Sequence, residues 1–378
     1  MSHTSSKQHS LTLQNLIRDR IEKETSISFK DFMQMALYQP GYGYYSSGAH
    51  KFGEHGDFIT APEIGSLFAQ TLAQQFKLII ETLPESIIVE LGAGTGQFCC
   101  DCLLELERQK ALPEKYYILE VSADLQDRQK QKIKTLPEYL HKRVHWIQQP
   151  LQQAFKGIVF ANEVLDALPV EVFRKHDDSH QQLRIVWDEG FKKQWQPMLT
   201  PLNQQLENKN LDLAADYVSE FVPNISAWLK TITENLDQGV VLFVDYGYDR
   251  SAYYHTQRKE GTLICFHQHQ ANFDYFNNIG LQDMTAFVDF TAVAEAADDC
   301  GLSVEGYTTQ AHFLIALEIQ DLLGESGSNY ENYYKNTTEM KKLTLPNEMG
   351  EKFKVMALSS NFDAELKGFE LSNQLHLL

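Results

Sequence analysis

The chain has 378 residues, of which 43% are hydrophobic, enough for one large domain or two smaller ones with a real core. No apolar run reaches the roughly 20 residues of a membrane-spanning helix, and the polar residues 1–10 do not resemble a signal peptide. Five cysteines, an odd number, argue against a disulfide framework. We therefore expect a cytoplasmic protein, or one from another reducing compartment.

The formal net charge of −18 bears on the partners of the protein. So acidic a surface repels a phosphate backbone, which disfavours nucleic acid as a substrate. It favours a basic segment of a partner protein, although part of the charge can serve solubility alone.

Residues 1–84 are expected to form a helical N-terminal region. An amphipathic helix lies near its start, and Ser28 is a candidate cap for a second helix over about 28–38. A loop rich in glycine and tyrosine follows over residues 41–56. Another apolar helix, over about 67–80, leads to the first strand.

From residue 86 onward strands and helices alternate, which predicts an α/β fold whose parallel sheet has helices on both faces. This core is expected over residues 85–322, with an inserted cap region at about 174–227 that has its own strands. A C-terminal extension covers residues 323–378. Candidate strands of the core are residues 87–91, 116–121, 144–148, 157–161, 240–245 and 312–318.

Residues 87–98 are the most informative stretch, because they read as a buried strand, a glycine turn and the start of a helix. Gly92, Gly94 and Gly96 let the backbone approach a ligand closely. The free N–H groups at the start of the following helix suit an anionic group. An ordinary turn with three glycines is the alternative.

Two further features separate the classes of cofactor. A dinucleotide fingerprint requires a glycine where this chain has Gln97. The form acid-Leu-Gly-x-Gly-x-Gly, which begins at Glu90, instead resembles motif I of class I S-adenosylmethionine-dependent methyltransferases. Glu120, followed by Ser122, ends another strand, where a carboxylate accepts both ribose hydroxyls of an adenosine. NAD enzymes use the same device, and a solvated acid is the alternative explanation.

A third polar group follows the strand at 157–161 and consists of Asn162, Glu163 and Asp166. In an open α/β sheet the ligand binds beyond the carboxyl ends of the strands, so we expect these side chains at the binding crevice. Asp245 repeats the arrangement one strand later. A single acid in such a place is usually a helix cap, but several are harder to explain in that way.

Two clusters that could suggest a metal are not expected to bind one. Cys99, Cys100 and Cys102 fall on the helix after the glycine turn, where cysteine behaves as a small apolar residue. A structural zinc site takes its ligands from two separated pairs. His267 and His269 have no HExxH motif or acidic partner at a recognisable spacing.

Beyond motif I, the chain resembles the MidA family of methyltransferases, which includes the mitochondrial complex I assembly-factor arginine methyltransferase. The resemblance runs from near residue 11 to about residue 360. The two N-terminal stretches and Asn-Glu-x-x-Asp-Ala-Leu-Pro are specific to the family, whereas the glycine turn is common to methyltransferases. The stretches that carry it are residues 38–45, 56–64, 87–98, 162–170, 283–290 and positions within 345–356.

The resemblance implies a Rossmann-like class I methyltransferase core that uses S-adenosylmethionine and releases S-adenosylhomocysteine. The resemblance also implies that the methyl acceptor is an arginine of a partner protein, and that this partner is a subunit of respiratory complex I (NADH dehydrogenase). It leaves the oligomeric state open, so that an oligomer is possible. The first long motif is implied to line the cofactor and substrate pocket. The residues expected at the cofactor are Thr60, Pro62, Glu90, Gly92, Gly94, Gly96, Glu120, Ser122, Asn162 and Glu163.

An arginine acceptor needs carboxylates, because its guanidinium has a pKa above about 12 and is charged in water. Carboxylates orient the group and localise its charge, which makes one nitrogen nucleophilic. We expect Glu63 and Asp166 to form this clamp as the catalytic pair, with Asp57 and Asp289 in reserve. Alternatively, Glu63 only caps the helix at 64–80.

Four positions depart from the family pattern, and they concern the substrate side rather than the cofactor. The chain has Phe287 where the pattern has His, Tyr275 and Ile279 where it has Pro, and Gly65 where it has Ser. Two other functions therefore stay open. One is an assembly chaperone that binds S-adenosylmethionine without turnover, and the other is a Rossmann oxidoreductase, which Gln97 disfavours.

Overall fold

The computed structural model describes residues 3–46, 60–324 and 330–378. Contacts within the chain define two compact units. Unit 1 comprises residues 1–58, 165–224 and 250–289, and unit 2 comprises residues 59–164, 225–249 and 290–378. Within the described ranges, no helix combines the length and the apolar character needed to cross a membrane.

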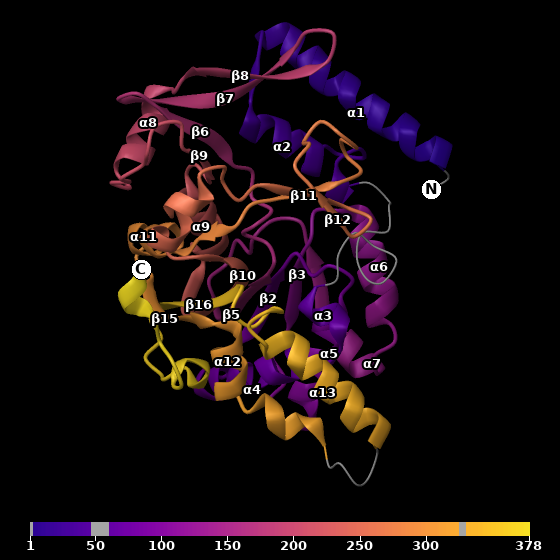
Figure 1. The fold of residues 1–378 in the computed structure, drawn as a ribbon. Helices are drawn as coiled ribbons and strands as arrows, with labels where there is room; N and C mark the ends of the chain where they lie inside the picture. The colour runs from indigo at the N-terminus through magenta and orange to yellow at the C-terminus, as the bar shows by residue number, and fades with distance from the viewer. Residues whose placement is uncertain (1–2, 47–59, 325–329) are drawn as a thin grey trace. The chain divides into compact units, whose positions relative to one another are not determined.

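Unit 2 is built on a mainly parallel sheet. Its strands are β2 (Ile87–Leu91), β3 (Tyr116–Leu119), β4 (Val144–Ile147), β5 (Phe155–Asn162), β10 (Leu236–Tyr248), β15 (Ser303–Thr309) and β16 (Phe353–Ser360). They lie in the order β15-β16-β10-β5-β2-β3-β4 (Figure 1). The five strands from β10 to β4 are parallel, and β16 is antiparallel to both of its neighbours. The predicted α/β class is confirmed.

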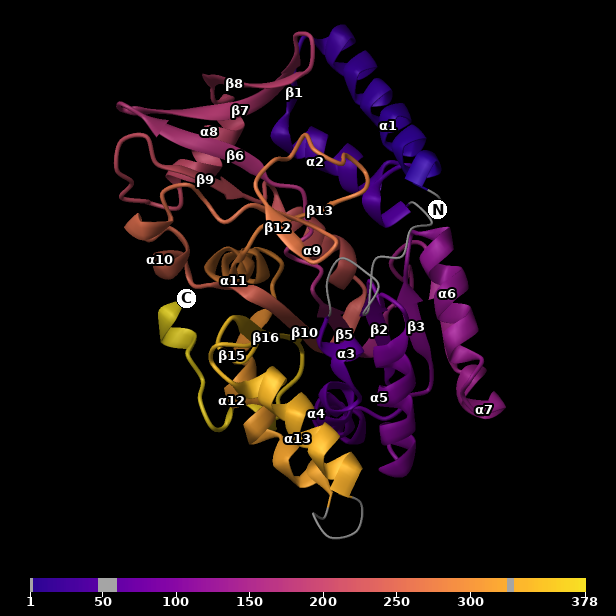
Figure 2. The ribbon, with the colours of Figure 1, turned by 45° about the vertical axis from the view of Figure 1, so that its right-hand side comes forward.

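Helices cover both faces of this sheet, which explains why β2 and most of β5 and β10 are continuously buried. Along β10, Leu242 faces the core shared with α4, α5, α12 and α13, whereas Phe243 faces Trp228 of α9, with ring centroids 6.1 Å apart. Figure 2 shows α12 beside β15, β16 and α13. The helices are α3 (Ala61–Ile64), α4 (Leu67–Thr82), α5 (Gln97–Arg108), α6 (Ala123–Ile133), α7 (Glu138–His141), α9 (Ile225–Thr233), α11 (Phe290–Asp299), α12 (Gln310–Ala316) and α13 (Tyr330–Thr344), with short 3-10 turns at Ile319–Leu323, Lys367–Phe369 and Leu375–Leu377.

One predicted strand is wrong. Residues 312–318 were expected to extend the sheet, but they belong largely to α12, which Thr309 caps by accepting a hydrogen bond from the His312 N–H at 3.2 Å. A short apolar run does not by itself distinguish a strand from a buried helix. The strands at this edge are instead β15 and β16, which the sequence pattern did not indicate.

Unit 1 contains two antiparallel sheets, and the expected strands of the insertion at 174–227 are present. Its elements are α1 (His3–Glu24), β1 (Ile27–Ser28), α2 (Phe29–Tyr38), a 3-10 turn (Tyr44–Ser46), β6 (Glu171–His176), β7 (Ser179–Trp187), β8 (Phe191–Pro197), α8 (Thr200–Glu207), β9 (Val218–Phe221), α10 (Arg250–Tyr253), a 3-10 turn (Thr256–Arg258), β11 (Ile264–His267), β12 (Gln270–Asn272), β13 (Asp283–Thr285) and β14 (Val288–Asp289). One sheet has the order β1-β7-β6-β9 with β8 also paired to β7, and the other has the order β12-β11-β13.

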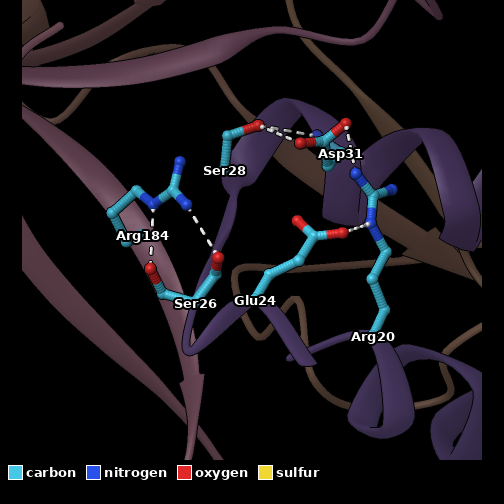
Figure 3. A network of polar contacts seen from close by, with 6 residues as sticks. All are labelled: Arg20, Glu24, Ser26, Ser28, Asp31 and Arg184. Atoms are coloured by element: carbon cyan, nitrogen blue, oxygen red, sulfur yellow. Dashed lines mark hydrogen bonds and ion pairs between the residues drawn. The ribbon is translucent and has the colours of Figure 1, made fainter. Parts of the chain in front are cut away.

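A polar network joins α1, α2 and β7 in unit 1 (Figure 3). Ser28 caps α2 as predicted, because its hydroxyl accepts a hydrogen bond from the Asp31 N–H at 3.0 Å. The Asp31 carboxylate in turn lies 3.3 Å from Arg20 of α1. Arg184 of β7 donates to the backbone oxygen of Ser26 at 2.7 Å. These contacts connect residues that are up to 158 positions apart in the chain.

Candidate cofactor site

The glycine turn connects β2 to α5 in unit 2, as the sequence predicts. Gly92, Gly94 and Gly96 have φ values of 62°, 53° and 84°, in the left-handed region that glycine adopts without strain. A Cβ at Gly92 would lie 3.1 Å from the Val164 side chain, whereas no described atom lies within 4 Å of a Cβ at Gly94. The turn therefore needs glycine for its backbone, and the space beside Gly94 is open within the described residues.

Gln129 of α6, a residue that was not predicted at the site, links this turn to the predicted ribose acid. Its side-chain amide donates to the Gly94 carbonyl at 3.0 Å and to the Glu120 carboxylate at 3.1 Å. Trp146 donates to the Gln129 side-chain oxygen at 3.0 Å. Gln129 is fully buried, and so the three contacts fix its position. A signal was available, because Gln129 interrupts an apolar stripe of Leu125 and Ile133 at helical spacing.

Glu120 follows β3 and is buried at the end of the sheet where the glycine turn lies. Its second carboxylate oxygen accepts a hydrogen bond from the Ser122 N–H at 2.9 Å, and the Ser122 hydroxyl caps α6. A carboxylate offers about four lone-pair positions, which makes it a suitable acceptor for a ribose diol. The structure brings Glu120 and Ser122 together with the turn, as expected.

Asn162 and Glu163 lie at the carboxyl end of β5, in a tight backbone segment. Glu163 has a φ of 53°, and its carboxylate accepts a hydrogen bond from the Asn162 amide at 3.1 Å. The other amide atom of Asn162, Oδ1, is buried and finds no hydrogen-bond partner in the described part of the chain. A buried acceptor of this kind suits a ligand that brings a donor, such as the ammonium group of S-adenosylmethionine.

Asp245 was expected at the binding crevice, but its hydrogen bonds give it a structural role. Its buried carboxylate accepts hydrogen bonds from the Val164 N–H at 3.1 Å and the Tyr246 N–H at 3.0 Å. It therefore supports the backbone that follows Glu163. This matches the ordinary reading of an acid at a strand end, which is a cap for nearby N–H groups.

Glu90 lies inside the core behind the turn. The Tyr116 hydroxyl donates to its carboxylate at 2.8 Å. Burial raises the pKa of Glu90 to about 8, although the hydrogen bond from Tyr116 opposes this shift. Cys99, Cys100 and Cys102 are also buried on α5, and burial raises the pKa of Cys100 to about 12. The buried position of Glu90 next to the glycine turn makes it a support of the turn. Direct contact between Glu90 and the cofactor stays a prediction.

Glu63 of α3 contacts the glycine turn directly, because the Thr95 hydroxyl donates a hydrogen bond to its carboxylate. The N-terminus of α4 is capped by Glu339, which accepts from the Leu67 N–H at 2.6 Å. Glu63 is therefore not the cap of α4. Thr60 and Pro62 form the start of α3, immediately before Glu63.

Asp166 belongs to unit 1, where three of the stretches that carry the family resemblance meet, residues 38–45, 162–170 and 283–290. Its carboxylate accepts a hydrogen bond from the Thr285 hydroxyl at 2.7 Å. The Tyr45 hydroxyl donates to Asp283 at 3.0 Å, and the Tyr38 hydroxyl donates to the Ala167 carbonyl at 2.8 Å. Since Glu63 belongs to unit 2, a clamp formed by Glu63 and Asp166 stays a prediction.

The two reserve acids differ in what the structure shows. Asp57 lies outside the described residues. Asp289 is an ion-pair acceptor in unit 1, with Lys209 at 3.2 Å and Arg250 at 3.4 Å from its carboxylate. Charges of the chain itself thus already neutralise Asp289.

The departures from the family pattern are accommodated in the fold. Ile279 is buried in the core of unit 1, and Tyr275 packs edge-on against Phe29 with ring centroids 5.1 Å apart. The Phe287 N–H donates to the Thr262 hydroxyl at 2.9 Å. Gly65 lies against the carboxylate of Glu339.

Comparison with known proteins supports the cofactor assignment. Residues 67–308 match a family described as S-adenosyl-L-methionine-dependent methyltransferases. A crystal structure of a Burkholderia thailandensis protein bound to S-adenosyl-homocysteine superposes with a TM-score of 0.95 at 34% identity, covering 100% of this chain and 99% of the other. A native structure from the same organism gives a TM-score of 0.92 at 33% identity, with the same coverage.

Curated relatives have lower identity but similar length. The mitochondrial protein arginine methyltransferase NDUFAF7 of Xenopus tropicalis is 27% identical, covering 94% of this chain and 88% of the relative. Its Drosophila melanogaster homologue is 26% identical over 92% and 84%. The family match disfavours the oxidoreductase alternative, and S-adenosylmethionine is the cofactor. The chain belongs to the MidA family of S-adenosylmethionine-dependent methyltransferases.

Proposed function

We propose that this chain transfers a methyl group from S-adenosylmethionine to an arginine side chain of a protein partner. The observation that carries the proposal is the half-buried Glu63 carboxylate, which Thr95 of the glycine turn holds by a hydrogen bond. This hydrogen bond supports the proposal that an acidic side chain lies close to the bound cofactor. The names of the curated relatives, which are protein arginine methyltransferases, support the choice of acceptor.

The cofactor supplies an electrophilic methyl group on a sulfonium, and the protein supplies position and charge. Methyl transfer is an in-line displacement, so holding the two reactants in line provides most of the acceleration. Glu120 would hold the ribose and the Asn162 side-chain oxygen would accept from the ammonium group. The other groups that would shape this site are Thr60, Pro62, Glu90, Gly92, Gly94, Gly96, Ser122 and Glu163.

On the acceptor side, Glu63 and Asp166 would orient the guanidinium and localise its charge on one end. A bidentate contact between a carboxylate and a guanidinium fixes the plane of the group. A hydrogen bond that tightens as the nitrogen attacks stabilises the transition state more than the bound substrate. The net charge of −18 favours a basic segment of the partner.

The partner is, by the family resemblance, a subunit of respiratory complex I. The location of the protein in the cell depends on where this partner is found, and a cytoplasmic location stays a prediction. Mass spectrometry of arginine methylation in cells with and without this gene tests the identity of the partner, because a complex I peptide should lose its methyl mark in cells without the gene. An unchanged set of methylated arginines would contradict the proposal.

A direct test uses purified protein, labelled S-adenosylmethionine and a partner extract. We expect label on arginine, and we expect Asp166→Asn to abolish most of it while binding of S-adenosylhomocysteine persists. Label on lysine or on a small molecule instead would show a methyltransferase with a different acceptor.

A second candidate function is an assembly chaperone that binds S-adenosylmethionine without turnover. Phe287 favours it, because a side chain without a titratable nitrogen stands where the family pattern has histidine. Binding of S-adenosylhomocysteine with no methyl transfer to any arginine substrate would support the chaperone. Any stoichiometric methylation would exclude it.

A further inference from the structure

Glu339 of α13 makes an unusual contact with the start of α4, within unit 2. Only 3% of Glu339 is exposed, and its carboxylate accepts a hydrogen bond from the Leu67 N–H at 2.6 Å. The preceding residue, Ser66, makes no side-chain cap. The contact joins positions 272 residues apart, so a side chain of the C-terminal extension caps a helix of the N-terminal region.

The same carboxylate explains Gly65. A Cβ at Gly65 would lie 2.0 Å from one oxygen of Glu339 and 2.8 Å from the other. The backbone of Gly65 is extended, with a φ of 171°, so the requirement for glycine is steric and not conformational. Where the family pattern has Ser, this chain has Gly65, and the carboxylate of Glu339 occupies the space of the missing side chain.

Gly65 lies two residues after Glu63, whose carboxylate accepts the hydrogen bond from Thr95 of the glycine turn. Glu63 is the third of the four residues of α3, so only Ile64 separates it from Gly65. So short a helix has little stability of its own and takes its position from the contacts at its ends. The side chain of Glu63 in this turn is held by Thr95, and the backbone just after the C-terminal end of the turn is held by Glu339.

We propose that Glu339 is a positioning residue of the cofactor site. By fixing the backbone from Gly65 to Leu67, it keeps Glu63 within reach of Thr95 and thereby orders the glycine turn. Burial raises the pKa of Glu339, while the hydrogen bonds from the start of α4 oppose that shift. The inference concerns cofactor binding, so it stands or falls independently of the arginine acceptor.

The test measures binding of S-adenosylhomocysteine by calorimetry, with the melting temperature as a record of folding. Glu339→Ala should weaken binding about fivefold, the size of a typical lost helix cap. Glu339→Gln keeps an acceptor but loses the charge, so its loss should be smaller. Glu331→Gln changes an exposed acid of the same helix and should leave binding unchanged.

A double-mutant cycle separates positioning from general destabilisation. If Glu339 acts through Glu63 and Thr95, the effect of Glu339→Ala should nearly vanish in a Thr95→Val background, where the hydrogen bond is already lost. Independent, additive losses in the cycle would overturn the proposal. If Glu339→Ala does not fold, Glu339→Gln enters the same cycle with the same criterion.

Gly65→Ser provides a second, opposite test. The serine side chain would meet the Glu339 carboxylate, so this change alone should weaken binding. In a Glu339→Ala background the space is free, and Gly65→Ser should then cost less than it does alone. An equal loss in both backgrounds would show that Glu339 does not determine the glycine.

Discussion

The glycine turn of unit 2 and the acid–tyrosine group of unit 1 (Tyr38, Tyr45, Asp166, Asp283 and Thr285) are assembled in different ways. Contacts around the turn join residues that are close in sequence, such as Gln129 and Gly94, 35 positions apart. Contacts in the acid–tyrosine group join residues 119 to 238 positions apart. A site formed at neighbouring strand ends can be recognised in the sequence as a motif. A site formed by distant segments appears in the sequence only as separate fragments.

The largest expected effect distinguishes the two sides of the reaction. Glu63→Gln keeps the shape of the side chain and removes its charge, so methylation should fall at least about 100-fold, roughly the cost of one preorganised electrostatic contact. Affinity for S-adenosylhomocysteine should change less than about threefold, or ~0.7 kcal/mol. Steady-state rates and calorimetry on the same preparation measure both.

The hydrogen bond from Thr95 makes the alternative outcome specific. If affinity and rate fall together, Glu63 belongs with the turn of unit 2 and not with the acceptor. Thr95→Val is the matched control, since it removes the hydrogen bond, which the side-chain oxygen of a glutamine at position 63 can still accept, and leaves the carboxylate in place.

The next effect tests the turn itself. Gly94→Val places a branched side chain in the open space beside the turn, and binding of S-adenosylhomocysteine should weaken by ~2 kcal/mol, about 30-fold, the scale of overpacking a tight site. Gly301→Val is a matched control, because Gly301 also has a positive φ, 71°, and no described atom within 4 Å of its Cβ position. If both variants lost the same affinity for S-adenosylhomocysteine, backbone strain and not contact with the ligand would explain the weaker binding.

A smaller effect is expected for the residue that joins the turn to the ribose acid. Gln129→Leu removes the donor to Gly94 and Glu120 and leaves the Trp146 N–H without its acceptor. We expect about tenfold weaker binding of S-adenosylhomocysteine, or ~1.4 kcal/mol, the size of a lost buried hydrogen bond. The exposed Gln152 provides the control, as Gln152→Leu should change nothing. A Gln129→Leu protein that binds normally would remove Gln129 from the site.

The smallest effect concerns stability in unit 1. Glu171 is buried, and its Oε2 atom has no hydrogen-bond partner among the residues that the structure describes. Burial raises the pKa of Glu171 from 4.5 to about 7, against an opposing hydrogen bond from Ser28. Between these values the folded state holds the proton more tightly than the unfolded state, so stability is lost as the pH rises through this window.

Glu171→Gln mimics the protonated form. Its melting temperature should be close to that of the natural protein near pH 5 and should exceed it near pH 8, by a few degrees at most. Glu189→Gln, at an exposed turn, should show no such trend. If the melting temperature of Glu171→Gln exceeded that of the natural protein by the same amount at every pH, Glu171 would not be the titrating group.

The sequence predicted the glycine turn and the strands beside it, because each of these elements carries a local signal, whereas the contacts of their residues with the cofactor stay a prediction. The glycine turn and Glu120 follow strands with continuous apolar residues, Asn162 is the last residue of such a strand, and β2 has the expected bounds. Gln129 was missed because its role depends on which face of α6 is buried. Glu339 was missed because its contact with Leu67 spans 272 positions and no local pattern encodes it.

At the far edge of the sheet the local signals conflict. The apolar run in α12 is compatible with a strand as well as with a helix. The local feature that favours the helix is its N-terminal cap, Thr309. In unit 1 the motif residues were recognised, but the hydrogen bond between Tyr45 and Asp283 depends on tertiary packing. The expected domain boundaries at 84 and 322 stay a prediction, beside the two units that the contacts define.

The position of β16 has a consequence for synthesis of the protein on the ribosome. β16 pairs with β10 on one side and β15 on the other, yet it is translated after both. Until it emerges, β10 presents an apolar strand with an unpaired edge, which is a template for aggregation. The nascent chain should therefore need a holding chaperone until β16 has been synthesised, and ribosome stalling before residue 353 should expose that dependence.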